Sequence, residues 1–234
     1  EDRMDWMIHN NQIDDSTLVE ALLSEFYPGL HGFIFSLSGQ PQLASAAGQQ
    51  AIAQAVMDRH RFWNETSLRA WLYRLAYLHL QNNLSQGKSI FFQSLRVARK
   101  SPASPNVPSK DKTARLYQEN RLPALLSYGY GLEEAEIAYI LGETTSVLHS
   151  HLNQNRLTLY LDAYPSNQLP KDHDHYLDLT FPPPKQSLSF ADQLEHEQHL
   201  PDCQFCQDFR QRLHALEKNW RNEFKPATLQ PELA

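Results

Sequence analysis

The chain has 234 residues, a formal net charge of −6 and 41% hydrophobic residues, enough for one large domain or two to three small ones with buried cores. A glycine count of 8 argues against a turn-rich all-β protein, so a helical protein is expected. No apolar run approaches the roughly 20 residues that cross a bilayer, and residues 1–10 lack a basic-then-apolar signal pattern, which predicts a cytoplasmic protein without a membrane span.

The N-terminal block, residues 1–86, predicts one helical domain. Between residues 16 and 37 the apolar positions recur at steps of three and four, which is the period of a helix, and Pro28 is expected to bend or split that stretch. An Ala/Gln-rich helix is predicted over residues 42–60, and another over residues 67–84.

Residues 87–112 predict a linker, because Ser, Lys, Arg and three prolines dominate there. The basic residues of this linker either contact the phosphates of a nucleic acid or serve only to keep a flexible tether soluble. Two further blocks are expected after it: a helical domain over residues 113–163, and a C-terminal domain over residues 164–234 that begins with a proline-punctuated segment. Residues 88–161 hold 9 Lys/Arg and 6 Asp/Glu, whereas both flanking blocks are net acidic, so only this middle block favours phosphate.

A helix-turn-helix is predicted within residues 122–159. Ala138 is small where two helices approach closely, Gly142 suits the left-handed end of the first helix, and Thr144 or Thr145 can cap the second. Spacing alone leaves open an ordinary helical hairpin.

Ten residues of this stretch resemble, in register, the fourth domain of extracytoplasmic-function (ECF) sigma factors. They are Gly131, Leu132, Glu136, Ile137, Ala138, Leu141, Gly142, Ser150, Leu152 and Arg156. Residues 67–76, Ser-Leu-Arg-Ala-Trp-Leu-Tyr-Arg-Leu-Ala, are similar to a Trp-containing stretch of the second domain of that family. Together the two blocks and their spacing cover most of residues 16–160.

The resemblance implies an all-α fold with two small sigma-type domains, a core RNA polymerase partner and promoter DNA. The residues it assigns to contact with polymerase or another protein partner are Gln49, Arg69, Trp71 and Arg74. The residues it assigns to DNA are Thr145, Ser146, His149, Ser150, His151, Asn153 and Arg156. His149, His151 and Gln154 stand where the family usually has Lys or Arg, so we expect weakened phosphate binding and, as the alternative, a helix-turn-helix face that contacts a protein.

The two cysteines belong to a His199-x3-Cys203-x2-Cys206 pattern. Two thiolates from a tight turn and a histidine from the preceding helix can meet one ion, and this spacing suits zinc; a metal-free redox pair is the alternative. The pattern resembles the signature of zinc-binding anti-sigma domains, as does the upstream segment at residues 176–178. That resemblance implies a fourth ligand, for which His173 is the first choice and His175 the second, with His196 or an acidic side chain as further alternatives.

The two resemblances lead to two alternative functional hypotheses. The first is a sigma-factor-like regulator acting with RNA polymerase and controlled in cis by its zinc domain. The second is a degenerate sigma scaffold that no longer reads promoters and acts as a protein adaptor or anti-sigma-type regulator. The sequence holds no nucleotide loop and no strong catalytic triad or paired-carboxylate pattern, so an enzyme is not expected; a metalloenzyme would need an open coordination position beside a pocket.

Overall fold

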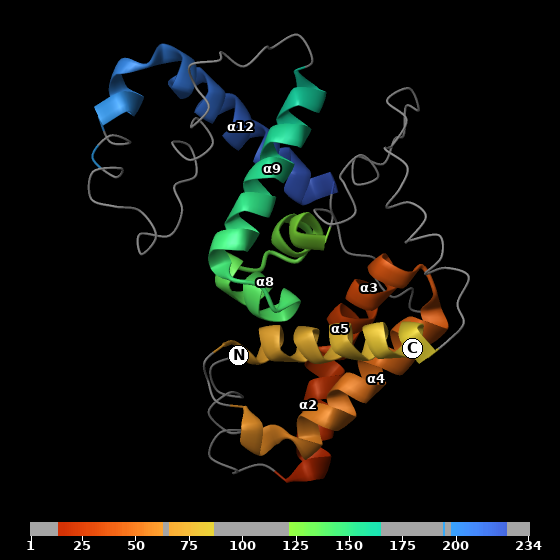
Figure 1. Ribbon diagram of the computed structural model, residues 1–234. Coiled ribbons are helices and arrows are strands. Elements are labelled where there is room, and N and C mark those ends of the chain that lie inside the picture. Colours follow the sequence, from red (N-terminus) through yellow and green to blue (C-terminus); the bar gives the residue numbers. More distant parts are fainter. Residues whose placement is uncertain (1–13, 63–65, 87–121, 165–193, 195–197, 224–234) are drawn as a thin grey trace. The chain divides into compact units, whose positions relative to one another are not determined.

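The structure is a computed structural model that describes residues 14–62, 66–86, 122–164, 194 and 198–223 (Figure 1). Every regular element in these ranges is helical, which confirms the all-α prediction. No helix in the described part of the chain has the length and apolar character to span a membrane. The predicted linker and the segment at residues 165–193 lie outside the described residues.

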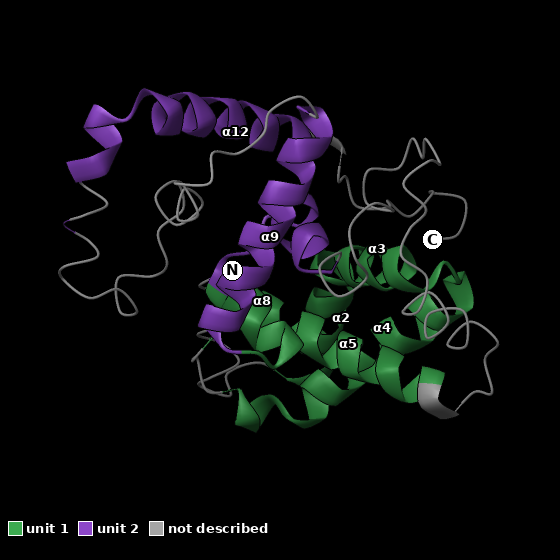
Figure 2. Ribbon diagram, turned by 45° about the horizontal axis from the view of Figure 1, so that its top comes forward, with its two compact units in different colours: residues 1–102, 135–143, 226–234 green, residues 103–134, 144–225 purple. Residues whose placement is uncertain are grey.

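The contacts divide the chain into two compact units, coloured separately in Figure 2. Unit 1 contains α2 (Asp15–Glu25), α3 (Tyr27–Ser38), α4 (Pro41–Met57), the 3₁₀ turn η1 (Arg59–Arg61), α5 (Leu68–Gln86) and nearly all of α8 (Glu134–Leu141). Unit 2 contains the π-helix η3 (Leu125–Gly129), α9 (Thr145–Ala163) and α12 (Gln204–Glu223).

The predicted break near Pro28 is confirmed. The side chain of Asp14 caps α2 by accepting hydrogen bonds from the backbone N–H groups of Ser16 and Thr17, at 3.1 and 3.0 Å. Helix α2 ends at Glu25, with Phe26 as its C-cap, and α3 carries Pro28 in its first turn, where the missing N–H of proline costs no intrahelical bond. Helix α3 ends at Gly39, whose φ of 64° is the left-handed conformation that favours glycine.

Small residues on α4 explain how α3 and α5 pack against it within unit 1. Ala44, Ala47 and Ala51 are fully buried, and their short side chains allow close approach of the neighbouring helices. The aromatic residues of α5 complete the core, with Tyr73 against Phe33 at a ring distance of 5.1 Å. Unit 1 therefore has its own packed core.

The core of unit 2 joins the C-terminal helix to the helix predicted to read DNA. Its buried members are Ala124, Tyr128, Leu159, Tyr160, Cys206, Phe209, Leu213 and Trp220. The four from α12 recur at steps of three, four and seven residues and so form one apolar stripe. Residues of the predicted domains 113–163 and 164–234 thus share one core, because this stripe buries its area against α9 and η3.

The helix ends expected of a helix-turn-helix occur at the predicted residues. Gly142 has a φ of 72°, and its N–H donates to the carbonyl of Ala138 at 2.9 Å, closing the end of α8. Thr144 is the N-cap of α9, and its hydroxyl accepts from the N–H of Val147 at 3.3 Å. Three residues therefore separate α8 from α9 along the chain.

Candidate functional site

The three predicted metal ligands come together where the helical residues 198–202 meet α12. The N–H of Cys203 donates to the carbonyl of His199 at 3.1 Å, and α12 begins at the next residue, so that Cys206 lies in the first turn of α12. The ligand atoms of His199, Cys203 and Cys206 all lie within 4.8 Å of one another, and His199 Nε2 is 3.3 Å from Cys206 Sγ. This group could hold a metal ion.

The chemistry of the donor set fits a soft divalent cation. Burial raises the pKa of Cys206 to about 12, with a further contribution from the neighbouring Cys203 thiol. Two adjacent thiolates are unfavourable in a buried site unless a cation neutralises them, and a bound divalent ion does that. His173, His175 and His196, the predicted choices for a fourth ligand, lie outside the described residues.

The metal group is attached directly to the core of unit 2. Cys206 is fully buried and belongs to the same cluster as Phe209, Leu213 and Trp220. Cys203 is only partly buried and packs at the edge of that cluster. Anything that fixes these two sulfur atoms therefore also fixes the start of α12 against its neighbours.

The residues predicted to contact DNA separate into two groups on α9. Thr145, Ser146 and Ser150 are exposed, and His151 is half-buried. By contrast, three of the predicted readers are buried: His149, Asn153 and Arg156 expose only 6%, 5% and 8% of their area. In this structure these three side chains contact other protein groups.

A chain of matched hydrogen bonds runs through those three side chains. Arg156 donates to Asn153 Oδ1 at 2.7 Å, which fixes the orientation of the amide and leaves its nitrogen as a donor. Asn153 Nδ2 therefore donates to His149 Nε2 at 3.0 Å, so this ring nitrogen is an acceptor. The proton of neutral His149 then sits on Nδ1, which donates to Glu134 Oε2 at 3.1 Å.

Two carboxylates of unit 2 neutralise Arg156. Its Nε donates to Glu217 Oε1 of α12 at 3.2 Å, and a terminal nitrogen lies 3.7 Å from Glu134 Oε1. The Tyr128 hydroxyl also donates to Glu217 Oε1, at 3.1 Å, and burial raises the pKa of this tyrosine well above its usual range. The hydrogen bond from His149 holds the pKa of Glu134 below its usual value, helped by the charge of Arg156.

Sequence reasoning missed Glu134, Glu217 and Tyr128. Glu217 is 61 residues from Arg156 in the sequence, and no local sequence pattern predicts a pairing over that separation. The sequence did contain a partial signal for an acidic partner of Arg156. Arg156 is the single Lys or Arg of α9, and an arginine that becomes buried on a half-apolar helix requires a carboxylate to neutralise it.

The residues predicted to contact polymerase also take different positions. Gln49 is exposed on α4, and the guanidinium of Arg69 lies 5.7 Å from the ring centre of Tyr73. Trp71 is 8% exposed and packs against Phe62, so it is a core residue.

Arg74 binds within unit 1. It donates to the backbone carbonyl of Tyr139 in α8, and its guanidinium lies 5.0 Å from the centre of the Tyr139 ring. The hydroxyl of Ser67, just before α5, donates to the carboxylate of Glu136 in α8. These contacts explain why α8 groups with the N-terminal helices.

No protein-family model matches the chain, and no curated protein sequence matches it significantly. What the described residues define is an all-helical protein with a His/Cys group able to hold a metal ion. Its more specific role rests on its own residues.

Proposed function

We propose that this protein is a sigma-factor-like transcription regulator that acts with RNA polymerase and is controlled in cis by its C-terminal metal-binding helix. The proposal combines the resemblance of residues 67–76 and 131–156 to ECF sigma factors with the packing of unit 2. Promoter DNA and core polymerase are its proposed partners, and zinc is the proposed metal.

One observation carries the regulatory part. Helix α12 packs against α9, and Glu217 of α12 pairs with Arg156, the only Lys or Arg in α9. DNA affinity depends on cations that neutralise phosphates, so a carboxylate on Arg156 competes directly with phosphate for the same guanidinium. The docked α12 therefore opposes DNA binding by α9.

The covalent connection makes such a contact effective even where it is weak. Because α9 and α12 belong to one chain, docking is intramolecular, and the covalent connection gives an effective concentration in about the millimolar range. The fully buried Phe209, Leu213 and Trp220 supply the apolar area that holds α12 in place. Disrupting this apolar contact should therefore release α12 from α9.

Zinc is supported by the donor set and its geometry. Two sulfur atoms and an imidazole nitrogen within 4.8 Å of one another suit tetrahedral zinc, which accepts a fourth ligand from elsewhere. Metal binding of this kind is coupled to local folding, so zinc would stabilise the start of α12. Loss of the metal would then weaken the docking of α12 on α9.

The test uses the 234-residue chain with two matched substitutions on α12. Leu213→Asp places a charge in the core and should release α12, whereas Ala215→Asp adds the same charge at an exposed position. Each protein is mixed with core RNA polymerase and genomic DNA fragments of the source organism at about 100 mM salt. At this ionic strength the Debye length is about 10 Å, so close contacts between protein cations and phosphates remain effective. Promoter-specific transcription that rises only for Leu213→Asp is the expected result.

A second candidate function is a sigma-like adaptor that binds protein and no longer reads promoters. It is favoured by the burial of Arg156 and by His149 and His151 at positions where the resembled family has cations. Binding of core polymerase by all three proteins without transcription from any of them would establish this function. Circular dichroism that shows native helix content in Leu213→Asp separates that outcome from misfolding.

A further inference from the structure

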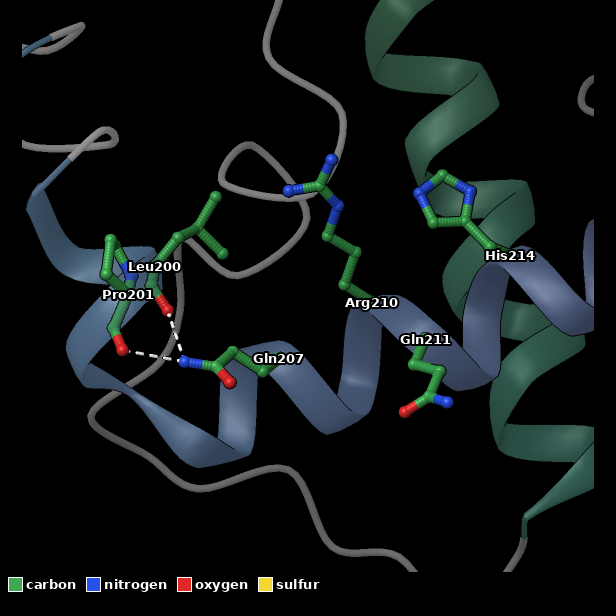
Figure 3. A pocket seen from close by; sticks show the side chains of 6 residues that line it. All are labelled: Leu200, Pro201, Gln207, Arg210, Gln211 and His214. Atoms are coloured by element: carbon green, nitrogen blue, oxygen red, sulfur yellow. Dashed lines mark hydrogen bonds between the residues drawn. The ribbon is translucent and has the colours of Figure 1, made fainter.

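An open pocket of about 430 Å³ lies along α12 beside the metal group (Figure 3). Leu200 and Pro201 form its apolar end, and Gln207, Arg210, Gln211 and His214 continue it along the helix. The amide nitrogen of Gln207 donates to the carbonyl oxygens of Leu200 and Pro201, at 3.0 and 2.7 Å. These two bonds fix the apolar end against α12 and so give the pocket a defined shape.

Basic side chains border the pocket at Arg210 and His214 and continue beyond it along α12, and together they form its basic rim. Arg210, His214, Lys218 and Arg221 recur at steps of four, four and three residues, which places them on one face of α12, and all four are exposed. Figure 3 shows the Arg210 and His214 side chains rising from the same side of the helix. This face of α12 is therefore rich in basic side chains, although the net charge of the chain is −6.

Two acidic residues of α12, Glu217 and Asp208, contact other protein groups. Glu217 is directed to Arg156 and Tyr128, although His214 Nδ1 also lies 3.7 Å from its second oxygen. Asp208 accepts a hydrogen bond from Gln204 at 2.8 Å. The nearest carboxylates of the helix are therefore already engaged by protein groups.

We propose that this pocket and its basic rim form a docking site for an acidic segment of a partner protein. An apolar side chain of the partner would sit on Leu200 and Pro201, and its carboxylates would lie beside Arg210 and the cations that follow it. Charge complementarity sets the orientation of the segment, and the apolar contact supplies affinity. The proposal does not depend on the sigma-like role.

The apolar end of the pocket favours protein over nucleic acid. A phosphate backbone is matched by cations and polar donors alone, whereas here the cations border a leucine and a proline. An acidic peptide that carries an apolar residue uses both parts of the surface. Nucleic acid binding is therefore the competing outcome of the test.

The test measures binding of a fluorescent peptide rich in Asp and Glu, with two central leucines, to the 234-residue protein in the presence of zinc. The key variant is Arg210→Glu, and its control is Arg212→Glu, the same change on another face of α12, where the guanidinium stacks on Tyr164 at 5.6 Å. We expect Arg210→Glu to weaken binding by at least about tenfold and Arg212→Glu to change it by less than about threefold, since reversed charge acts most strongly at the contact.

Three results would overturn the proposal. They are equal losses for the two variants, unchanged affinity when serines replace the leucines of the peptide, and binding of a DNA duplex at 150 mM salt in place of the peptide. Circular dichroism checks that both variants keep the helix content of the unaltered protein, since both changes are at exposed positions.

Discussion

Helices α9 and α12 are nearly equal in length, 19 and 20 residues, and share one core, yet they place their charges in opposite ways. Helix α9 buries its single arginine among carboxylates and amides, whereas α12 keeps Arg210, Lys218 and Arg221 at the surface. The number of cations in a helix therefore says little about ligand binding until the burial of those cations is known. Resemblance to a DNA-reading helix cannot supply that information.

The largest effect should come from the His199, Cys203 and Cys206 group at the start of α12. Replacing both cysteines, Cys203→Ser with Cys206→Ser, should abolish stoichiometric zinc and lower the free energy of unfolding of unit 2 by more than about 5 kcal/mol, because structural zinc supplies roughly 10–16 kcal/mol in small zinc-folded peptides. Elemental analysis and thermal unfolding measure the two effects. Asp208→Ser is the control, and equal zinc content in both proteins would contradict the metal assignment.

The shared core should give the next largest effect. Leu213 is fully buried between α12 and its neighbours, so Leu213→Ala should cost about 2–5 kcal/mol through lost burial and the cavity left behind. Leu161 on α9 is 37% exposed, and Leu161→Ala should cost less than about 1 kcal/mol. Urea unfolding compares the two; similar costs would show that α12 is not docked in solution.

The ion pair between the two helices should contribute less. Glu217→Gln removes the nearer carboxylate from buried Arg156 and leaves the more distant carboxylate of Glu134, which should cost about 1–3 kcal/mol. In the double variant with Arg156→Met the uncompensated charge is gone, so part of that cost should be recovered. A double-mutant cycle from urea unfolding measures the coupling, and a coupling of zero would break the contrast drawn between α9 and α12.

The smallest effect should come from Glu134 and acid. Its folded pKa is depressed, so its contribution to stability is present above the unfolded value near pH 4.3 and is lost as the pH falls through the lower folded value. The side chain is 30% exposed, which limits the contribution to less than about 1 kcal/mol. Unfolding midpoints from pH 6 to pH 3 should fall less steeply for Glu134→Gln than for the unaltered protein; parallel curves would refute this role.

Local features of the fold were predictable from the sequence because neighbouring residues determine them. Gly142 ends α8 and Thr144 caps α9 as expected, and the break before Pro28 follows from the backbone of proline. The grouping of His199 with the two cysteines is also local, since all three fall within two turns of helix. The π-helix at residues 125–129 was not expected, because the spacing of apolar residues in the sequence does not distinguish so short a π-helix from an α-helix.

The environment of the predicted DNA-reading residues could not be predicted. The burial of Arg156 depends on Glu217, and that pairing depends on the apolar stripe of α12 packing against residues more than forty positions earlier. Periodicity identified each helix separately but contains no information about which apolar face meets which. The same limit applies to Trp71, whose place against Phe62 is a matter of packing.

The corner formed by Leu200 and Pro201 lies in the chain between His199 and Cys203 and also forms the end of the proposed peptide pocket. An occupant of the pocket and an ion at the sulfur atoms would therefore each depend on the same short piece of backbone. Thermodynamic reciprocity then requires that, by whatever factor zinc tightens the peptide, the peptide tightens zinc by the same factor. A protein partner that binds the zinc-loaded form more tightly would for the same reason slow the release of zinc to a chelator.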